Sequence, residues 1–162
     1  ASIGDVIGAA LGPVVVGATF LEPGPAAVEE AGELEGAVFY HGTDVGTARG
    51  FLSGAGLDAE EAEARAKGGD LGFYLATEPG PASVFGHRAG DATNSAGTVL
   101  QYDISQEAVA QLQNAGAHLR PIPYGGGLGN PKGTEFFIPP SAFDLFNQLR
   151  GAGNIRITPA RW

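Results

Sequence analysis

The chain has 162 residues, of which 43% are hydrophobic, and this length suits a single domain with a real core. It contains no cysteine, which excludes disulfides, thiolate metal sites and a cysteine nucleophile. The formal net charge of -9 disfavours broad electrostatic binding to nucleic acid or to anionic lipid. With 27 glycines and 11 prolines, turns must be frequent and the helices and strands short.

The first 36 residues differ from the rest. Residues 6–21 are apolar, but they include glycines and a proline and are fewer than the roughly 20 apolar residues that cross a bilayer. We interpret residues 1–36 as an apolar linker or extension and residues 37–162 as a compact domain, and we expect no stable membrane association. The alternatives are that residues 1–36 touch a membrane or that they are the remains of a junction to a larger upstream protein.

Helices and strands are predicted to alternate irregularly along the chain. Strands are expected from aromatic and β-branched residues at 37–41, 72–77, 98–104, 119–123, 134–138 and 154–158. Helices are expected at 25–34, 44–53, 58–67, 79–88, 105–116 and 141–151. Four of these helices follow a residue that can cap them, namely Asp44, Asp58, Ser105 and Ser141. Without regular βαβ spacing, this mixture indicates an α+β domain.

Three short motifs stand at or near predicted strands, and each presents one polar side chain. They are Tyr40-His41-Gly42-Thr43, Gly72–Thr77 with Tyr74, and Gly133–Phe137 with Glu135. An imidazole can hydrogen-bond a ligand hydroxyl, and a following glycine lets a ligand approach the backbone. The alternative roles are ordinary: His41 bonded to core neighbours, Tyr74 and Phe85 as core residues, and Glu135 as a solvated edge residue.

In this order, the motifs resemble the His-Tyr-Glu site of the ADP-ribosyltransferases, the superfamily of diphtheria toxin and the poly(ADP-ribose) polymerases. The resemblance implies a split β-sheet core with short flanking helices, and NAD as co-substrate. It implies that the catalytic residues are His41, Tyr74 and Glu135. It implies that NAD is bound by His41, Gly42, Thr43, Tyr74, Ser83 and Phe85.

The resemblance also assigns a role to each side chain. His41 would bind the adenosine ribose, and the backbone of Gly42 would hold the nicotinamide carboxamide. Tyr74 and Phe85 would pack on the two sides of the nicotinamide ring. Glu135 would bond the 2′-hydroxyl of the nicotinamide ribose and stabilise the positive charge that develops there.

Two positions depart from the pattern of the relatives. A serine that bonds the carboxamide is expected three residues before the second aromatic, but Ala82 stands there and Ser83 follows. Either the register shifts by one residue or this contact is missing. Gly133 stands where arginine-modifying relatives carry a second Glu or a Gln, which disfavours arginine as the acceptor.

The predicted function is therefore that of a mono-ADP-ribosyltransferase which modifies a macromolecule, either protein or RNA. The style of the sequence resembles the C-terminal toxin domains of bacterial Rhs-type polymorphic toxins. That likeness implies an effector delivered into the cytoplasm of a target cell, with a cognate immunity protein. We expect a monomer without a metal site, surface positions for His87 and His118, and a mobile glycine-rich loop over residues 124–133.

Three alternatives remain open at this point. An NAD glycohydrolase would use water as the acceptor. A non-catalytic binding module would keep only the shape of the pocket. In a third interpretation, the apolar residues 1–36 disrupt membranes and are themselves the active part.

Overall fold

The computed structural model describes residues 36–61, 71–127 and 129–160. These residues belong to two compact units, one that contains residues 36–37 and 103–109 and one that contains the other described residues. The predictions for residues 1–35, including the helix at 25–34, lie outside the described residues. The same holds for residues 62–67 of the helix predicted at 58–67.

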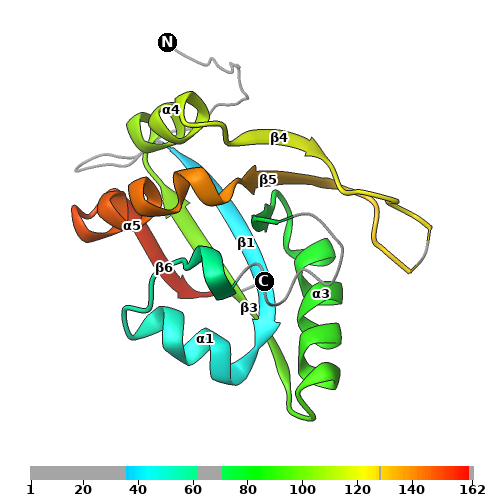
Figure 1. Ribbon diagram of the computed structural model, residues 1–162. Coiled ribbons are helices and arrows are strands. Elements are labelled where there is room, and N and C mark those ends of the chain that lie inside the picture. Colours follow the sequence, from blue (N-terminus) through cyan, green and yellow to red (C-terminus); the bar gives the residue numbers. More distant parts are fainter. Residues whose placement is uncertain (1–35, 62–70, 128, 161–162) are drawn as a thin grey trace. The chain divides into compact units, whose positions relative to one another are not determined.

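Six strands form one sheet, and helices stand between them in the chain (Figure 1). The strand order is β4-β5-β2-β1-β3-β6. The pairs β1–β2, β2–β5 and β4–β5 are antiparallel. The strands are β1 (Ala37–Asp44), β2 (Phe73–Ala76), β3 (Gly97–Ile104), β4 (His118–Pro121), β5 (Thr134–Ile138) and β6 (Ile155–Pro159). The helices are α1 (Val45–Leu52), α3 (Pro79–Ala92), α4 (Gln106–Asn114), the 3₁₀ helix η2 (Pro140–Ala142) and α5 (Phe143–Gly151). The prediction of a mixed α+β fold is confirmed.

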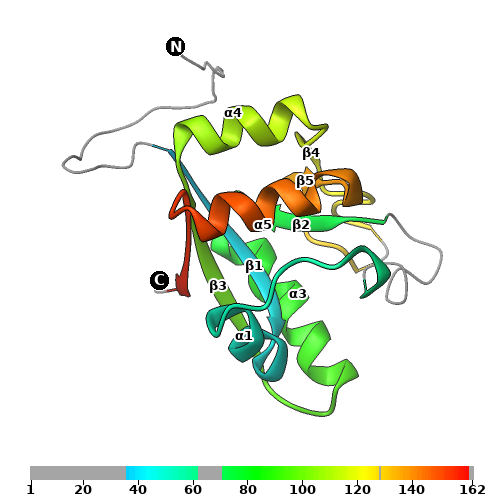
Figure 2. The same cartoon turned by 60° about the vertical axis from the view of Figure 1, so that its left-hand side comes forward.

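Helices α3 and α1 cover opposite faces of β1. A Cβ atom at Gly42 would lie 2.5 Å from the backbone nitrogen of Gly86 in α3, whereas the ring of the preceding His41 contacts Phe51 in α1. Because successive residues of a strand point to opposite faces, the two helices lie on opposite sides. Figures 1 and 2 show α3 alongside β1 and β3.

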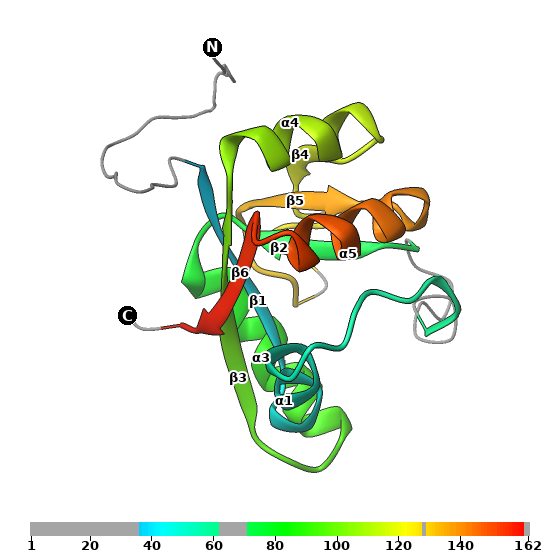
Figure 3. The ribbon, with the colours of Figure 1, turned by 90° about the vertical axis from the view of Figure 1, so that its left-hand side faces the viewer.

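The sheet turns sharply between β2 and β1. In Figure 3, β2 and β5 run across the direction of β1 and β3. The register there pairs Tyr40 of β1 with Ala76 of β2.

Aromatic rings fill the other face. Phe73 of β2 lies within 6.1 Å of the ring centres of Phe51, Tyr102 and Phe146, and Phe39 stacks on Phe136 at 5.0 Å. Tyr102, Phe136 and Phe146 are almost wholly buried. Burial of such rings supplies most of the hydrophobic stabilisation of a domain of this size.

Most of the predicted helix starts are confirmed, and one is wrong. The Asp44 carboxylate accepts a hydrogen bond from the backbone nitrogen of Thr47 at 3.0 Å and begins α1. Ser141, however, does not cap α5, because it lies inside the 3₁₀ turn η2 and the helix begins at Phe143. Two consecutive prolines, Pro139 and Pro140, fix that turn and move the helix start by two residues.

The smaller unit is described at residues 36–37 and 103–109. There the Ser105 hydroxyl accepts a hydrogen bond from the Ala108 nitrogen at 3.1 Å, as its predicted capping role requires. A side chain at Gly36 would overlap the backbone of Ile104. Across the described part of both units, no helix is long and apolar enough to traverse a bilayer.

Candidate functional site

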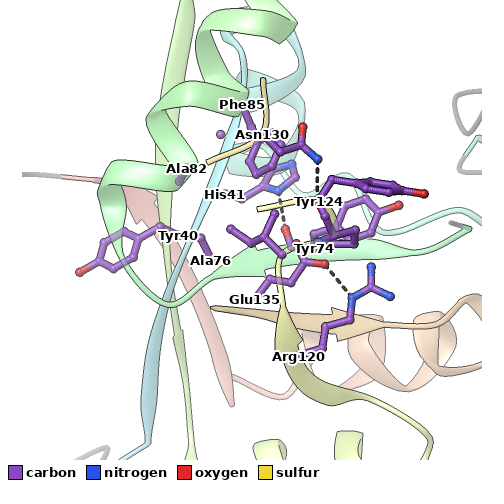
Figure 4. A pocket seen from close by; sticks show the side chains of 13 residues that line it. Tyr40, His41, Tyr74, Ala76, Ala82, Phe85, Arg120, Tyr124, Asn130 and Glu135 are labelled. Carbon is purple, nitrogen blue, oxygen red and sulfur yellow. Dashed lines mark hydrogen bonds and ion pairs between the residues drawn. The ribbon is translucent and has the colours of Figure 1, made fainter. Parts of the chain in front are cut away.

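A cavity of about 510 Å³ opens in the larger unit, and it collects the predicted site residues from distant parts of the sequence (Figure 4). Its walls come from β1, β2, β4, β5, helix α3 and the loop after β4. The lining residues are Tyr40, His41, Gly42, Tyr74, Ala76, Ala82, Phe85, Arg120, Ile122, Pro123, Tyr124, Asn130 and Glu135.

Strand register places most of the strand residues of this cavity on one face of the sheet. Opposite residues of an antiparallel pair point to the same side. Tyr74 is opposite Phe137, Ala76 is opposite Glu135, and Glu135 is opposite Arg120. We call this side the pocket face, and its residues are Tyr40, Gly42, Tyr74, Ala76, His118, Arg120, Glu135 and Phe137.

Tyr74 is partly buried and lines the cavity from β2. Its ring centre is 5.7 Å from that of Phe137, its partner in register. Phe85 lines the cavity from α3. The structure thus brings Tyr74 and Phe85 to the same cavity from two different elements.

His41 reaches the cavity from the opposite side of β1. Its imidazole lies 4.3 Å from the ring centre of Phe73 and contacts Phe51 edge-on. Its Nδ1 is 2.9 Å from the carbonyl oxygen of Tyr74, which can only accept, so this nitrogen carries the proton. The core neighbours expected for an ordinary histidine are therefore present, although His41 also lines the cavity.

The absence of a side chain at Gly42 is required by α3. A Cβ atom there would overlap the carbonyl oxygen of Ala82. Ala82, Gly86 and Gly90 recur every four residues along α3 and are all buried, so they form one small-residue ridge. This ridge lets α3 lie against the backbone of β1 and β3, and it explains a helix that runs four residues past its predicted end.

Glu135 is the buried carboxylate of the cavity. It is 3% exposed, and its Oε2 accepts a hydrogen bond from the Nε of Arg120 at 2.8 Å. The interpretation of Glu135 as a solvated edge residue is wrong, because β4 covers it on the side away from β2. Arg120 and Glu135 are the two residues of opposite fixed charge in the cavity lining.

The loop between β4 and β5 forms a wall of the cavity and is closed on itself by hydrogen bonds. Gly126 donates to the carbonyl oxygen of Asn130 at 2.8 Å, and the Asn130 side chain donates to that of Pro123 at 2.7 Å. Arg88 of α3 donates to the Asn130 side chain at 2.9 Å and also to the carbonyl oxygen of Gly129. These bonds oppose the expected mobility of this glycine-rich segment.

Two predicted binding residues do not line the cavity. Thr43 is 5% exposed and lies within β1. Ser83 points its hydroxyl at the carbonyl oxygen of Gly80, at 3.1 Å, while Ala82 occupies the cavity wall. Neither Ser83 nor another serine is among the described residues that line the cavity.

Sequence reasoning overlooked Arg120, Tyr124 and Asn130 as cavity residues. Arg120 can be recognised as a neighbour of Glu135 only when the pairing of β4 with β5 is known, because the register then puts the two residues opposite each other. Tyr124 is 72% exposed and has a positive φ of 57°, a backbone state that is uncommon outside glycine. Tyr40 lines the cavity as well, although Figure 4 shows its ring turned away from the other side chains.

Within the described ranges there is no group of three or more His, Asp or Glu side chains arranged to hold a metal ion. His87 and His118 are exposed, as predicted.

No family model, no curated protein and no solved structure matches this chain.

Proposed function

We propose that the chain is an NAD-dependent mono-ADP-ribosyltransferase with His41, Tyr74 and Glu135 in its active site. The observation that carries this proposal is their convergence: three side chains from three separate sequence motifs line one cavity. Two of them, Tyr74 and Glu135, also share the pocket face.

The cavity suits NAD in size and in chemistry. Its volume of about 510 Å³ lies within the range of roughly 300–1,000 Å³ that is typical of small-molecule sites. The nicotinamide ring of NAD is a cation, and the aromatic residues Tyr74 and Phe85 can stack on it and attract its charge. The Glu135 carboxylate can accept a hydrogen bond from a ribose hydroxyl.

In the proposed reaction, the bond between nicotinamide and C1′ of the ribose breaks, and its electron pair leaves with the nicotinamide nitrogen, which becomes neutral. The acceptor nucleophile forms the new bond to C1′ and releases its proton to solvent. Positive charge grows on the ribose while this happens. A fixed Glu135 anion stabilises that charge more than it stabilises the neutral sugar, and this difference accelerates the step.

The proposed fold is the split β-sheet core of the ADP-ribosyltransferases. The order of the central strands supports it, because β5, β2 and β1, which carry Glu135, Tyr74 and His41, are direct neighbours. The sharp turn between β2 and β1 supports it as well (Figure 3).

The proposed acceptor is a macromolecule, either protein or RNA, in the cytoplasm of a target cell. Delivery as a polymorphic-toxin effector and inhibition by an immunity protein belong to the same proposal. Gly133 has a φ of 153°, and a Cβ atom there would lie 3.1 Å from Pro81 and 3.3 Å from Ile122. The position that holds a second acid in arginine-modifying relatives is therefore occupied by backbone alone. This disfavours arginine as the modified residue.

The decisive experiment is the replacement Glu135→Gln, which keeps the size of the side chain but removes its charge. We expect nicotinamide release from NAD to fall by about 100-fold or more. Glu78→Gln, at an exposed residue before α3, is the matched control and should retain full turnover. Equal turnover in Glu135→Gln and the unaltered protein would refute the mechanism, provided that circular dichroism shows both to be folded.

Labelled NAD distinguishes transfer from hydrolysis. Incubation with cell extract should transfer the label to a macromolecule. Digestion with protease or with nuclease then shows whether that macromolecule is protein or nucleic acid. Consumption of NAD without any labelled macromolecule would instead assign the protein as an NAD glycohydrolase.

A further inference from the structure

Arg120 is held against the pocket face by its neighbours on β5 and β2. Its Nε bonds Glu135 at 2.8 Å, and its guanidinium carbon lies 4.2 Å from the ring centre of Phe137 and 5.7 Å from that of Tyr74. A planar cation on aromatic rings gains electrostatic attraction and loses little conformational freedom. The orientation of this guanidinium is therefore set by packing as well as by the ion pair.

Burial of the ion pair between Arg120 and Glu135 carries a desolvation penalty. The two side chains are 21% and 4% exposed, so both charges have lost much of their hydration. Apolar residues of similar volume would pack at least as well and are often no less stable than a buried pair. Stability alone therefore does not account for an ion pair at this cavity wall.

We propose that Arg120 is a positioning residue, which holds the Glu135 carboxylate ionised and in one orientation for the nicotinamide ribose. This inference rests on the proposed function. Arg120 acts through Glu135, and it has no bond to make or break in the reaction.

Removal of the guanidinium leaves a buried carboxylate without its adjacent cation. Both the burial and the lost cation favour the protonated acid, so Glu135 should take up a proton at a higher pH than before. The other titratable groups of the cavity are His41, Tyr74, Tyr124 and Tyr40. All four groups are present in every variant, so a change in the midpoint reports the loss of the Arg120 charge.

The first test is the titration of the Glu135 carboxyl carbon by ¹³C NMR, which requires no activity. In Arg120→Leu the midpoint should rise by about one pH unit or more. Arg156→Leu, at an exposed arginine of β6, is the control and should leave the midpoint unchanged. An unchanged midpoint in folded Arg120→Leu overturns the inference. If that variant does not fold, Arg120→Gln, which keeps a hydrogen-bond donor but no charge, takes its place with the same expected shift.

The second test is kinetic. At pH 7, Arg120→Leu should lower kcat for nicotinamide release by about 100-fold, and the KM for NAD should change by less than about threefold. The acidic limb of the kcat profile should move by the same amount as the NMR midpoint. Arg120→Lys, which keeps the charge but loses the planar stack, should recover part of kcat. Unchanged kcat, or a change in KM alone, contradicts the inference.

The two tests separate this inference from the proposed function. If the unaltered protein releases no nicotinamide while the Glu135 midpoint still shifts in Arg120→Leu, the enzymatic function is wrong and the control of Glu135 by Arg120 stands. If turnover is normal and the Glu135 midpoint does not shift in Arg120→Leu, the enzymatic function stands and the control of Glu135 by Arg120 is wrong.

Discussion

The hydroxyl group of Tyr102 in β3 lies in an apolar environment that does not satisfy it. The side chain is fully buried among aromatic rings, and the hydroxyl oxygen has no hydrogen-bond partner among the described residues. Burial raises the pKa of this phenol, an effect that the charge of Arg150 offsets only in part. An unsatisfied buried donor typically costs about 1–3 kcal/mol.

We therefore expect Tyr102→Phe to increase the free energy of unfolding by about 1 kcal/mol at pH 7. The pH dependence identifies the cause. Above about pH 10 the unfolded chain ionises this phenol while the folded protein keeps it protonated, so unfolding releases a proton and stability falls by up to about 1.4 kcal/mol per pH unit.

Urea unfolding of both proteins between pH 7 and pH 11 measures this difference. Tyr40, Tyr74 and Tyr124 are present in both, so the gap between the two curves reports Tyr102 alone. The gap should widen above pH 10, and a constant gap would contradict the assignment.

At the scale of the elements, the small-residue ridge of α3 fixes how closely this helix approaches the sheet. Cβ atoms at Gly86 and Gly90 would lie 2.7 Å from the Thr98 oxygen and 2.6 Å from the Gly97 nitrogen. Such distances leave no space for even a methyl group. The ridge therefore positions Phe85, which stands between Ala82 and Gly86 in sequence, at the cavity.

Gly42→Ala tests this packing from the side of β1. The added methyl group would overlap backbone atoms of α3, which cannot move aside as a flexible side chain can, so we expect a loss of about 3 kcal/mol or more in unfolding free energy. Gly151→Ala, at the end of α5, meets nothing within 4 Å and should instead stabilise by about 0.5–1 kcal/mol. Equal effects of the two substitutions in thermal or urea unfolding would refute the packing argument.

Local sequence signals predicted most elements of this fold. Residues 134–138 were predicted as a strand and form β5, because aromatic and β-branched residues follow one another there. Ser141 misled the prediction, since a good capping residue was outweighed by the turn that Pro139 and Pro140 impose. Ser83 is a similar case, because its position on α3 depends on a ridge of small residues that no single residue reveals.

At the scale of the whole cavity, Arg88 joins α3 to the loop between β4 and β5. Its guanidinium donates to Asn130 and Gly129, and its carbon lies 5.5 Å from the ring centre of Phe85. The wall made by α3 and the wall made by the loop are therefore held to each other directly.

Arg88→Met should release the loop while leaving the sheet intact. We expect the Gly126 amide, which bonds the carbonyl oxygen of Asn130, to exchange its hydrogen about tenfold faster. Arg49→Met, at an exposed arginine of α1, is the control and should leave that amide unchanged. Unaltered protection in Arg88→Met would show that the loop holds its shape without α3.

The sequence alone indicated His41, Tyr74 and Glu135 as candidate site residues, because each stands in a short motif at a predicted strand. It did not indicate Arg120 as a cavity residue, since Arg120 lies beside Glu135 only because β4 pairs with β5. Asn130 was hidden for a related reason: an asparagine in a glycine-rich loop is ordinary until its bonds to Pro123 and Arg88 are known.

The alignment of β4 with β5 makes the chemistry of the cavity sensitive to the length of the β4 strand. A displacement of β4 by one residue would invert its side chains, so that Leu119 would meet Glu135 and the arginine would point to the far side. A single deletion or insertion within β4 would thus separate Glu135 from Arg120, whereas changes of length inside the glycine loop would preserve the pairing. Natural variation in length should therefore accumulate in the loop and be excluded from the strand.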